Sequence, residues 1–204
     1  MATCKILSWN IRGGRNLDKR LSIFKHIKTL KPTICLLQET HVLETDLNIW
    51  ASNWGVGKIY INPGSSRSAG QVFLINKDIT VLEHRIVVRG RLHTLKFKIN
   101  NCTLTIANVY APNSDHDRIA FFNNLMELLA TYDYGDQIIL GGDFNVTLGK
   151  EDKFGGIDNN PKSRNKLKDI INSFDLEDIW RYRNKGMKHF TCEQPTPLIR
   201  CRLD

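Results

Sequence analysis

An α+β fold, with sheet layers covered by helices, is the architecture that two patterns in this sequence indicate. Short β-branched and aromatic runs bounded by turn residues are typical of strands, and three longer segments carry apolar residues at helical spacing. Because the helical segments are interspersed with antiparallel strands, we expect sheets packed under helices. The chain has 204 residues and is 41% hydrophobic, which suits one globular domain over residues 1–204.

Six apolar runs are the expected strands. They are Lys5–Asn10, Ile34–Glu39, Val72–Asn76, Leu95–Ile99, Thr103–Tyr110 and Gln137–Gly142. The stretch RIVVRGRLHTLKFKINNCTLTIANVY (85–110) reads as three strands joined by two turns, which is an antiparallel meander. Asn100-Asn101 suits the tip of its second hairpin.

Three helices are expected, at residues 17–30, 115–131 and 164–174. The first places Leu17, Leu21, Phe24, Ile27 and Leu30 on one stripe and is followed by Pro32. Ser114 and Ser163 stand where N-caps of the other two helices belong. All three helices are interpreted as structural.

The charge of the chain is uneven. The net charge is +8 and the sequence pI about 9.3. Residues 1–100 hold 16 Lys and Arg against 6 Asp and Glu, whereas residues 101–204 hold 13 against 15. A basic surface favours a polyanionic partner such as nucleic acid, although it also serves general solubility.

Apolar runs and cysteines bear on the cellular compartment of the protein. No apolar run approaches the roughly 18 residues of a membrane span, and the first residues lack a signal-peptide pattern, so no membrane partner is expected. Five cysteines in apolar surroundings and without metal-type spacing indicate reduced thiols and an intracellular location.

Polar side chains stand where four of the expected strands end. They are Asn10, Glu39, Tyr110 with Asn113, and Asp143 with Asn145. Because residues two apart in an extended segment point the same way, the last two are expected to face one spot. The alternative is a polar turn that merely caps a strand.

These side chains offer oxygen ligands for a hard cation and hydrogen-bonding groups for a phosphate. Mg²⁺ binds carboxylate oxygens, keeps several waters and often shares a substrate phosphate. The sequence holds no phosphate-binding G-x-x-x-x-G-K-[ST] loop, no G-x-S-x-G elbow and no H-E-x-x-H motif. The pattern therefore suits metal-assisted attack on a phosphodiester.

Four motifs carry a resemblance to a known family. LSWNIRGG, LLQETH, NVYAPN and GGDFNV occur in that order, and together they resemble the endonuclease/exonuclease/phosphatase superfamily, which includes exonuclease III and the abasic-site endonucleases. The motifs QETH, NVYAPN and RLD most resemble the endonuclease domain of non-LTR retrotransposon polyproteins. The resemblance implies a four-layer α/β/β/α sandwich of two mixed, mainly antiparallel sheets, with the active site at one rim.

The resemblance also implies roles for matched residues. Metal ligands would be Asn10, Glu39, Asp143 and Asn145, with Mg²⁺ as the cofactor and Mn²⁺ as its alternative. Catalytic groups would be Tyr110, Asp143, Asn145 and Asp204, the last of which would orient a histidine. Phosphate and DNA contacts would come from Asn113 and Thr191, and the polar loops add Arg67 and Lys153 as guesses.

The resemblance breaks at the C-terminal end. In the family a Ser-Asp-His segment comes after the position of Asp204, so the domain is expected to be incomplete at that end, with its final strand or strands and a histidine missing. His41 and His116 follow site motifs and are the candidates to replace that histidine. Cys201 stands where Ser is usual, and Gln71 where a small apolar residue is frequent.

Three functions stay open. The first is a Mg²⁺-dependent nuclease of the exonuclease III or abasic-site endonuclease type, which nicks DNA to leave a 3′-hydroxyl for target-primed reverse transcription. The second is a catalytically dead or poorly folding remnant that at most binds nucleic acid. The third is a phosphatase or phosphodiesterase acting on small or lipid phosphoesters. The first implies DNA and the reverse transcriptase domain of the same polyprotein as partners, a monomer, and a nuclear location.

Overall fold

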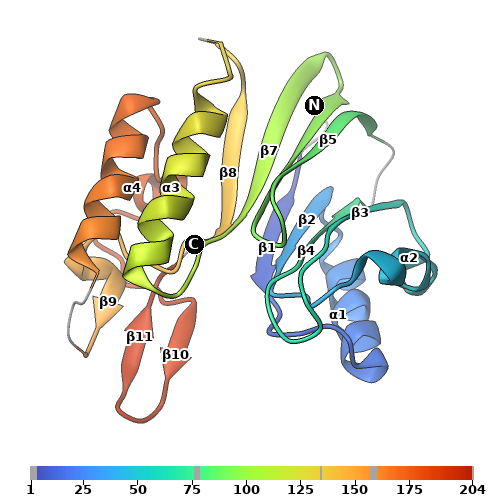
Figure 1. Ribbon diagram of the computed structural model, residues 1–204, viewed down its shortest axis with the longest axis horizontal. Coiled ribbons are helices and arrows are strands. Elements are labelled where there is room, and N and C mark those ends of the chain that lie inside the picture. Colours follow the sequence, from blue (N-terminus) through green and yellow to red (C-terminus); the bar gives the residue numbers. More distant parts are fainter. Residues whose placement is uncertain (1–3, 76–78, 134, 157–159, 204) are drawn as a thin grey trace. The chain divides into compact units, whose positions relative to one another are not determined.

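The computed structural model describes residues 4–75, 79–133, 135–156 and 160–203. The chain folds into two compact units (Figure 1). Unit 1 comprises Met1–Tyr110 and Asp133–Asp143, and unit 2 comprises Ala111–Tyr132 and Phe144–Asp204.

Unit 1 contains two four-stranded mixed sheets. Sheet A has the order β1 (Ile6–Asn10), β2 (Ile34–Gln38), β4 (Gln71–Ile75) and β3 (Lys58–Asn62). Sheet B has the order β5 (Thr80–Val88), β6 (Leu92–Ile99), β7 (Cys102–Tyr110) and β8 (Ile138–Asp143). β1 runs parallel to β2 and β7 parallel to β8, whereas the other neighbours are antiparallel.

Two apolar layers hold unit 1 together. One lies between the sheets and is formed by Ile34, Leu36, Phe73, Ile75, Ile79, Leu95, Phe97 and Ile106. The other packs the opposite face of sheet A against α1 (Leu17–Leu30) and α2 (Leu47–Trp54), which cover that face in Figure 1. β2 is buried on both faces, as expected of a central strand between two layers.

α1 begins at the cap that its sequence provides, but of the predicted stripe only Phe24 and Ile27 are buried. The Asn16 side chain accepts a hydrogen bond from Lys19 N, which satisfies a free donor of the first turn. Leu17 and Leu21 are 48% and 41% exposed. The buried side is formed by Arg20, Ile23, Phe24 and Ile27. Phe24 packs edge to face on the two tryptophans of α2, and the Arg20 guanidinium lies 5.2 Å from the centre of the Trp50 ring, so this unpredicted helix selects the buried side of α1.

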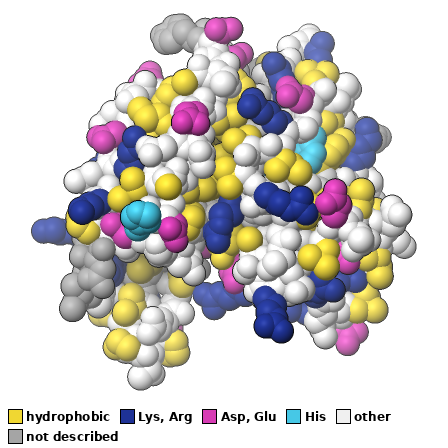
Figure 2. Space-filling view, viewed as in Figure 1, with side chains coloured by type: hydrophobic (Ala, Val, Ile, Leu, Met, Phe, Trp, Pro, Cys, Tyr) yellow, Lys and Arg dark blue, Asp and Glu magenta, His cyan; other side chains and the backbone are white. Residues whose placement is uncertain are grey.

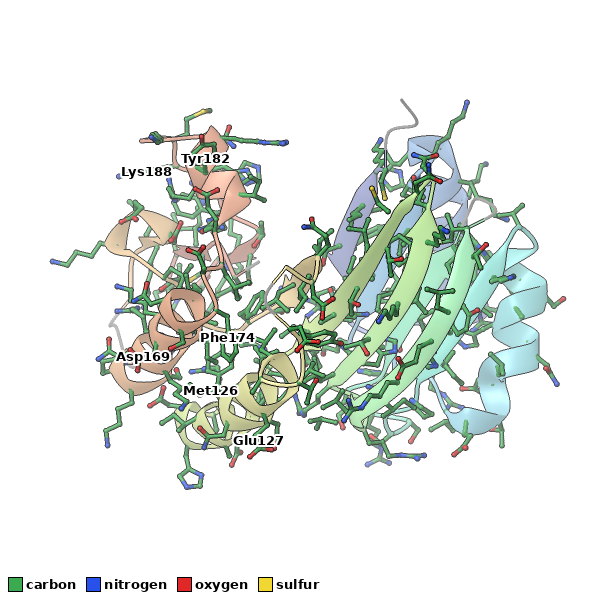
Figure 3. All side chains as sticks on the ribbon, turned by 90° about the horizontal axis from the view of Figure 1, so that it is seen from above. Met126, Glu127, Asp169, Phe174, Tyr182 and Lys188 are labelled. Carbon is green, nitrogen blue, oxygen red and sulfur yellow. The ribbon has the colours of Figure 1, made fainter. Side chains whose placement is uncertain are left out.

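Unit 2 consists of three helices and a small sheet. The helices are α3 (Asp115–Leu129), α4 (Pro161–Ser173) and α5 (Ile179–Arg183). α3 and α4 lie side by side, with Met126 on α3 and Phe174 just after α4, while the exposed Glu127 and Asp169 belong to their outer sides (Figure 3). The sheet has the order β10 (Cys192–Gln194), β11 (Ile199–Cys201) and β9 (Lys153–Phe154).

The chain also contains two single-turn 3-10 helices, η1 (Glu44–Asp46) and η2 (Lys150–Asp152). Among the described residues, no helix combines the length and the apolar character that crossing a bilayer demands. On the face shown in Figure 2, Lys and Arg side chains are spread among acidic, polar and apolar ones and do not gather over one element.

Most of the predicted elements are present. The meander is confirmed as β5, β6 and β7, and its second hairpin turns at Asn100-Asn101, between Ile99 and Cys102, which pair with each other. The predicted strand Val72–Asn76 corresponds to β4, and Asn76 lies outside the described residues. The elements α2, α5, β3 and the three-stranded sheet were not predicted.

Candidate active site

Four of the expected site residues lie together in unit 1. Three of them are the last residues of their strands: Asn10 of β1, Tyr110 of β7 and Asp143 of β8. Glu39 follows β2 directly. Parallel pairing brings the ends of β1 and β2 to one edge of sheet A and those of β7 and β8 to one edge of sheet B. A hydrogen bond of 2.9 Å from Asn10 Nδ2 to Asp143 Oδ2 joins the two sheets there.

The Tyr110 phenol is hydrogen-bonded to the Glu39 carboxylate and keeps its proton. Burial raises the pKa of Tyr110 to about 12, and the charges of Glu39 and Asp143 act in the same direction. The Arg91 guanidinium, 5.1 Å from the centre of the ring, opposes that rise. A phenol that is neutral at pH 7 is a hydrogen-bond donor for carboxylate or phosphate oxygens.

Glu39 leaves its strand through an unusual backbone conformation. Its φ of 52° lies in the left-handed region, which residues with a Cβ atom seldom occupy. Backbone hydrogen bonds on both sides hold this turn, from Gly13 N to Glu39 O at 2.6 Å and from Thr40 N to Gly70 O at 3.0 Å. Such residues cluster at functional sites, where the surrounding structure imposes the conformation.

A fully buried polar network supports the strands that carry these side chains. Gln38 Nε2 donates to Asn108 Oδ1 at 2.8 Å, and Gln71 Nε2 donates to Asn108 O at 2.8 Å. Asn108 Nδ2 lies 3.2 Å from His93 Nε2, and Asn62 Nδ2 donates to Gln71 Oε1 at 3.1 Å. The network crosses from sheet A to sheet B, and Gln38 and Asn108 precede site residues by one and two positions. It therefore fixes how the two sheets meet beneath the site.

Gly142 explains why glycine precedes the site aspartate. A Cβ atom at this position would lie 2.0 Å from the carbonyl oxygen of Val109, and the φ of Gly142 is 138°. Only glycine lets β8 approach β7 this closely. That approach sets Asp143 opposite Tyr110 in the parallel register.

Asn113 and Asn145 belong to unit 2, where Asn145 contacts the loop that carries Asn113. Asn145 Nδ2 donates to Ala111 O at 2.7 Å. The buried Arg118 of α3 donates through its NH1 group to the carbonyls of Pro112 and Asn113, at 2.9 and 3.0 Å. The loop that carries Asn113 is thus held from both sides.

The prediction that Asp143 and Asn145 belong to one extended segment is wrong. β8 ends at Asp143, and Asn145 has a φ of 51°. Because the chain turns after Asp143, the two-residue alternation of a strand does not extend to Asn145.

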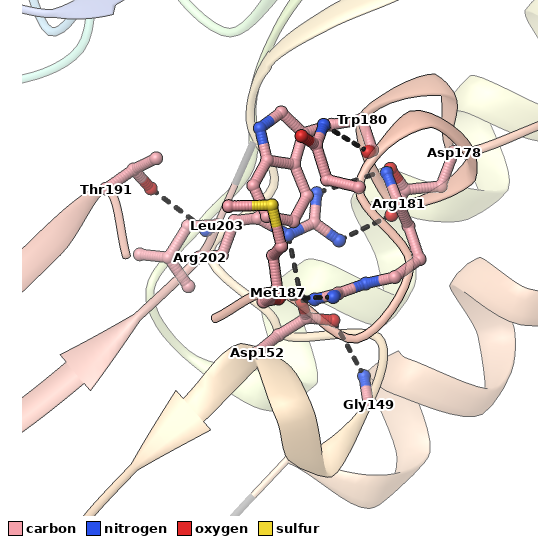
Figure 4. A network of polar contacts seen from close by, with 10 residues as sticks. Gly149, Asp152, Asp178, Trp180, Arg181, Met187, Thr191, Arg202 and Leu203 are labelled. Carbon is pink, nitrogen blue, oxygen red and sulfur yellow. Dashed lines mark hydrogen bonds and ion pairs between the residues drawn. The ribbon is translucent and has the colours of Figure 1, made fainter. Parts of the chain in front are cut away.

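An ion-pair cluster anchors the end of the described chain in unit 2 (Figure 4). Arg202 Nε donates to Asp152 Oδ1 at 2.8 Å, and its NH2 group pairs with Asp178. Arg181 also pairs with Asp152, and the Arg202 guanidinium lies 5.1 Å from the Trp180 ring centre. Burial alone would raise the pKa of Asp152, but hydrogen bonds from both arginines hold it below its ordinary value.

Thr191 lies beside the segment that the cluster anchors. Its hydroxyl accepts a hydrogen bond of 3.2 Å from Leu203 N, and Leu203 O accepts one of 2.8 Å from Phe144 N. Asp204, the expected partner of a catalytic histidine, lies outside the described residues.

The remaining candidates take different places. Arg67 is exposed, in a turn of unit 1, and Lys153 lies on β9 of unit 2, opposite Cys201. His41 Nε2 lies 3.9 Å from Glu39 Oε1, beyond hydrogen-bonding distance. His116 is 95% exposed and contacts Asp117. His41 borders the unit 1 cluster, and His116 belongs to unit 2.

The cluster in unit 1 fits a hydrated hard cation. It offers two carboxylates, Glu39 and Asp143, and the Asn10 amide, whose Oδ1 accepts a hydrogen bond from Arg12 N at 3.1 Å. Mg²⁺ typically binds one or two protein carboxylates and keeps its remaining waters. Over the described ranges, no three His, Cys, Asp or Glu side chains gather as a protein cage would need. The fourth expected ligand, Asn145, belongs to unit 2.

The residues that support the site were not predicted from the sequence. Gln38 and Asn108 interrupt otherwise apolar strands inside two of the quoted motifs, and a buried carboxamide in such a strand is the signal that it must have a partner. Arg118 and Arg202 offered no such signal, because arginines on a helix and near the C-terminal end are ordinarily solvated.

Comparisons with known proteins agree with these observations. The Endonuclease/Exonuclease/phosphatase family matches residues 7–193. The Transposon TX1 uncharacterized 149 kDa protein of Xenopus laevis is 31% identical over 192 residues, which are 91% of this chain and 14% of that protein. An exodeoxyribonuclease of Bacillus subtilis (strain 168) is 28% identical over 155 residues, 70% of this chain and 58% of that enzyme.

Solved structures share the fold. An AP endonuclease from Archaeoglobus fulgidus matches with a TM-score of 0.78 and 19% identity, over 94% of this chain and 79% of that chain. The α+β sandwich predicted from the sequence, with two mixed sheets, is thereby confirmed. This chain spans less than two thirds of the length of either curated relative.

Proposed function

This chain belongs to the endonuclease/exonuclease/phosphatase family, and from that premise we propose that it is a Mg²⁺-dependent DNA endonuclease. The observation that carries the proposal is the cluster of Asn10, Glu39, Tyr110 and Asp143, which combines hard oxygen donors with a protonated phenol. That set of groups suits the hydrolysis of a phosphodiester.

The residues of the cluster are proposed to have separate roles in metal binding and phosphate binding. Glu39, with Asn10 beside it, would hold Mg²⁺, which when bound stabilises charge on the phosphate and on the leaving oxygen. Tyr110 would donate its hydrogen bond to the scissile phosphate. Its raised pKa keeps that proton in place at neutral pH.

Asp143 is the group proposed to take a proton from the attacking water. The hydrogen bond from Asn10 Nδ2 orients its carboxylate. In-line attack of that water forms the new P–O bond and breaks the bond to the 3′ oxygen, which is protonated and leaves as a 3′-hydroxyl. Asn113, Asn145 and Thr191 of unit 2 are proposed to contact the phosphate backbone.

A mobile element is the proposed setting. The similarity to the Xenopus laevis transposon protein, of which this chain matches only a small part, supports a domain of a larger polyprotein. There the 3′-hydroxyl would prime synthesis by a reverse transcriptase of the same polyprotein, in the nucleus.

The test is nicking of a supercoiled plasmid in Mg²⁺, with EDTA as the blank. Asp143→Asn should slow nicking by about 10²–10⁴-fold, because it removes the proton acceptor. Asp169→Asn, at an exposed carboxylate of α4, is the matched control and should nick as the wild type does. Circular dichroism establishes that all three proteins are folded. Wild-type nicking by Asp143→Asn would refute the assignment.

A second assay decides the substrate class. The wild-type protein is given plasmid and a small phosphomonoester together at one ionic strength. Nicking without phosphate release is the expected result. Phosphate release without nicking would make the protein a phosphatase of the same fold instead.

A further inference from the structure

Two cysteines oppose each other across the β10–β11 hairpin of unit 2. The antiparallel register pairs Cys192 with Cys201 directly. Directly opposed residues of antiparallel strands have Cα atoms about 4.5–5.5 Å apart, which lies within the 4.4–6.8 Å that disulfides span. Both residues are partly buried, and neither forms a disulfide in this structure.

No other described strand pairing opposes two cysteines. Cys35 faces Leu7 and Leu74, and Cys102 faces Ile99. Cys35 is also buried, so that oxidants reach it poorly. The Cys192–Cys201 pair is therefore the one site in these pairings where backbone geometry already suits a disulfide.

A basic side chain lies next to Cys201 in the same sheet. Lys153 of β9 is opposite Cys201 on its other side, so one row across the sheet reads Cys192, Cys201, Lys153. Burial raises the pKa of Cys201, Lys153 lowers it and a Cys192 thiolate raises it.

We propose that Cys192 and Cys201 are a site of reversible disulfide formation driven by hydroperoxides. The thiolate of one cysteine attacks the peroxide, breaks its O–O bond and becomes a sulfenic acid, while the hydroxide released takes up a proton. The second thiol attacks the sulfenic sulfur, forms the S–S bond and releases a second water. In total, two thiols and one hydrogen peroxide give one disulfide and two waters.

The disulfide would join the two strands at the base of their hairpin. Thr191 precedes Cys192, and Arg202 follows Cys201, so the cross-link lies between the Thr191–Leu203 hydrogen bond and the hairpin tip. Oxidation would therefore slow the opening of this hairpin without changing its register.

The test uses the full chain and hydrogen peroxide. After oxidation, the excess peroxide is removed, free thiols are alkylated under denaturing conditions, and a non-reducing digest is analysed by mass spectrometry. Of the five cysteines, three should be alkylated, and one cross-linked peptide should join Cys192 to Cys201. Dithiothreitol should restore all five thiols.

Two cysteine variants and oxidation of the unfolded protein show whether the cross-link is specific to Cys192 and Cys201. Cys102→Ser removes the exposed thiol of β7 and should leave the cross-link unchanged. Cys192→Ser should abolish the cross-link and leave Cys201 alkylated. Oxidation in concentrated urea should scatter disulfides over many pairs. A native protein whose Cys201 stays alkylated, or whose pairings match those in urea, would overturn the proposal.

Discussion

The Tyr110 phenol is hydrogen-bonded to Glu39 and lies in the field of Asp143, and its ionisation can be followed by titration. The folded protein raises its pKa to about 12, against about 10 for an unperturbed tyrosine. Its ionisation therefore favours unfolding. The free energy of unfolding should keep this contribution below pH 10 and lose it as the pH rises towards 12.

Tyr110→Phe should remove the last tyrosine ionisation of the folded protein. Ultraviolet absorbance of tyrosinate during an alkaline titration measures it. Tyr182→Phe, at an exposed tyrosine of α5, should leave that last step in place. A late ionisation that persists in Tyr110→Phe would show that the cause of the shift lies elsewhere.

Gly142 is the residue on which the approach of β8 to β7 depends. Gly142→Ala should destabilise the protein by at least about 2 kcal/mol, because the new Cβ atom meets the Val109 carbonyl and the backbone is strained. Urea unfolding measures the loss. Gly135 also has a positive φ, but a Cβ atom there would meet no atom within 4 Å. The stability lost in Gly135→Ala therefore measures the backbone strain alone. Equal losses in the two variants would argue against the clash.

At the scale of elements, a pair of histidines makes sheet B sensitive to acid. His84 Nε2 lies 3.1 Å from His93 Nδ1, and burial lowers the pKa of both below the ordinary 6.5. The unfolded chain therefore binds these protons more readily than the folded one. Stability should be complete above pH 6.5 and fall as the pH drops below it.

His93→Gln should flatten this dependence while keeping a hydrogen-bonding side chain in the network. Urea unfolding at a series of pH values measures the slope. His116→Gln, at the exposed start of α3, should keep the wild-type slope. The same slope in His93→Gln would contradict the account.

Elements with strong local signals could be predicted from the sequence, whereas those fixed by packing could not. The β6–β7 hairpin has alternating strands and an Asn-Asn tip, and its register follows from them. The buried face of α1 does not follow from its own sequence, because Leu17 and Leu21 fit the stripe as well as Ile23 does. The choice depends on Trp50 and Trp54, which belong to a helix with no comparable signal.

The candidate site divides in the same way. Parallel pairing of strands makes the meeting of Asn10, Glu39, Tyr110 and Asp143 predictable, because each follows an apolar run. The turn at Asn145 was not predictable, since a positive φ there depends on its contact with Ala111.

At the scale of the whole molecule, the net charge of +8 predicts salt-dependent binding to DNA. Each phosphate that the protein neutralises releases counterions, so the logarithm of the affinity should fall linearly with the logarithm of the salt concentration. Fluorescence anisotropy of a labelled duplex measures the slope. A flat salt dependence would count against a surface that contacts several phosphates.

The central claim is that Glu39 holds the metal ion of a nuclease. Its most direct test is the rate of plasmid nicking over a range of Mg²⁺ concentrations, for the wild type and for Glu39→Gln. The wild-type rate should rise with Mg²⁺ and saturate, and Glu39→Gln should be slower by about 10²-fold or more. Glu83→Gln, at an exposed glutamate of β5, should follow the wild-type curve. Wild-type nicking by Glu39→Gln, or nicking that EDTA does not stop, would contradict the claim.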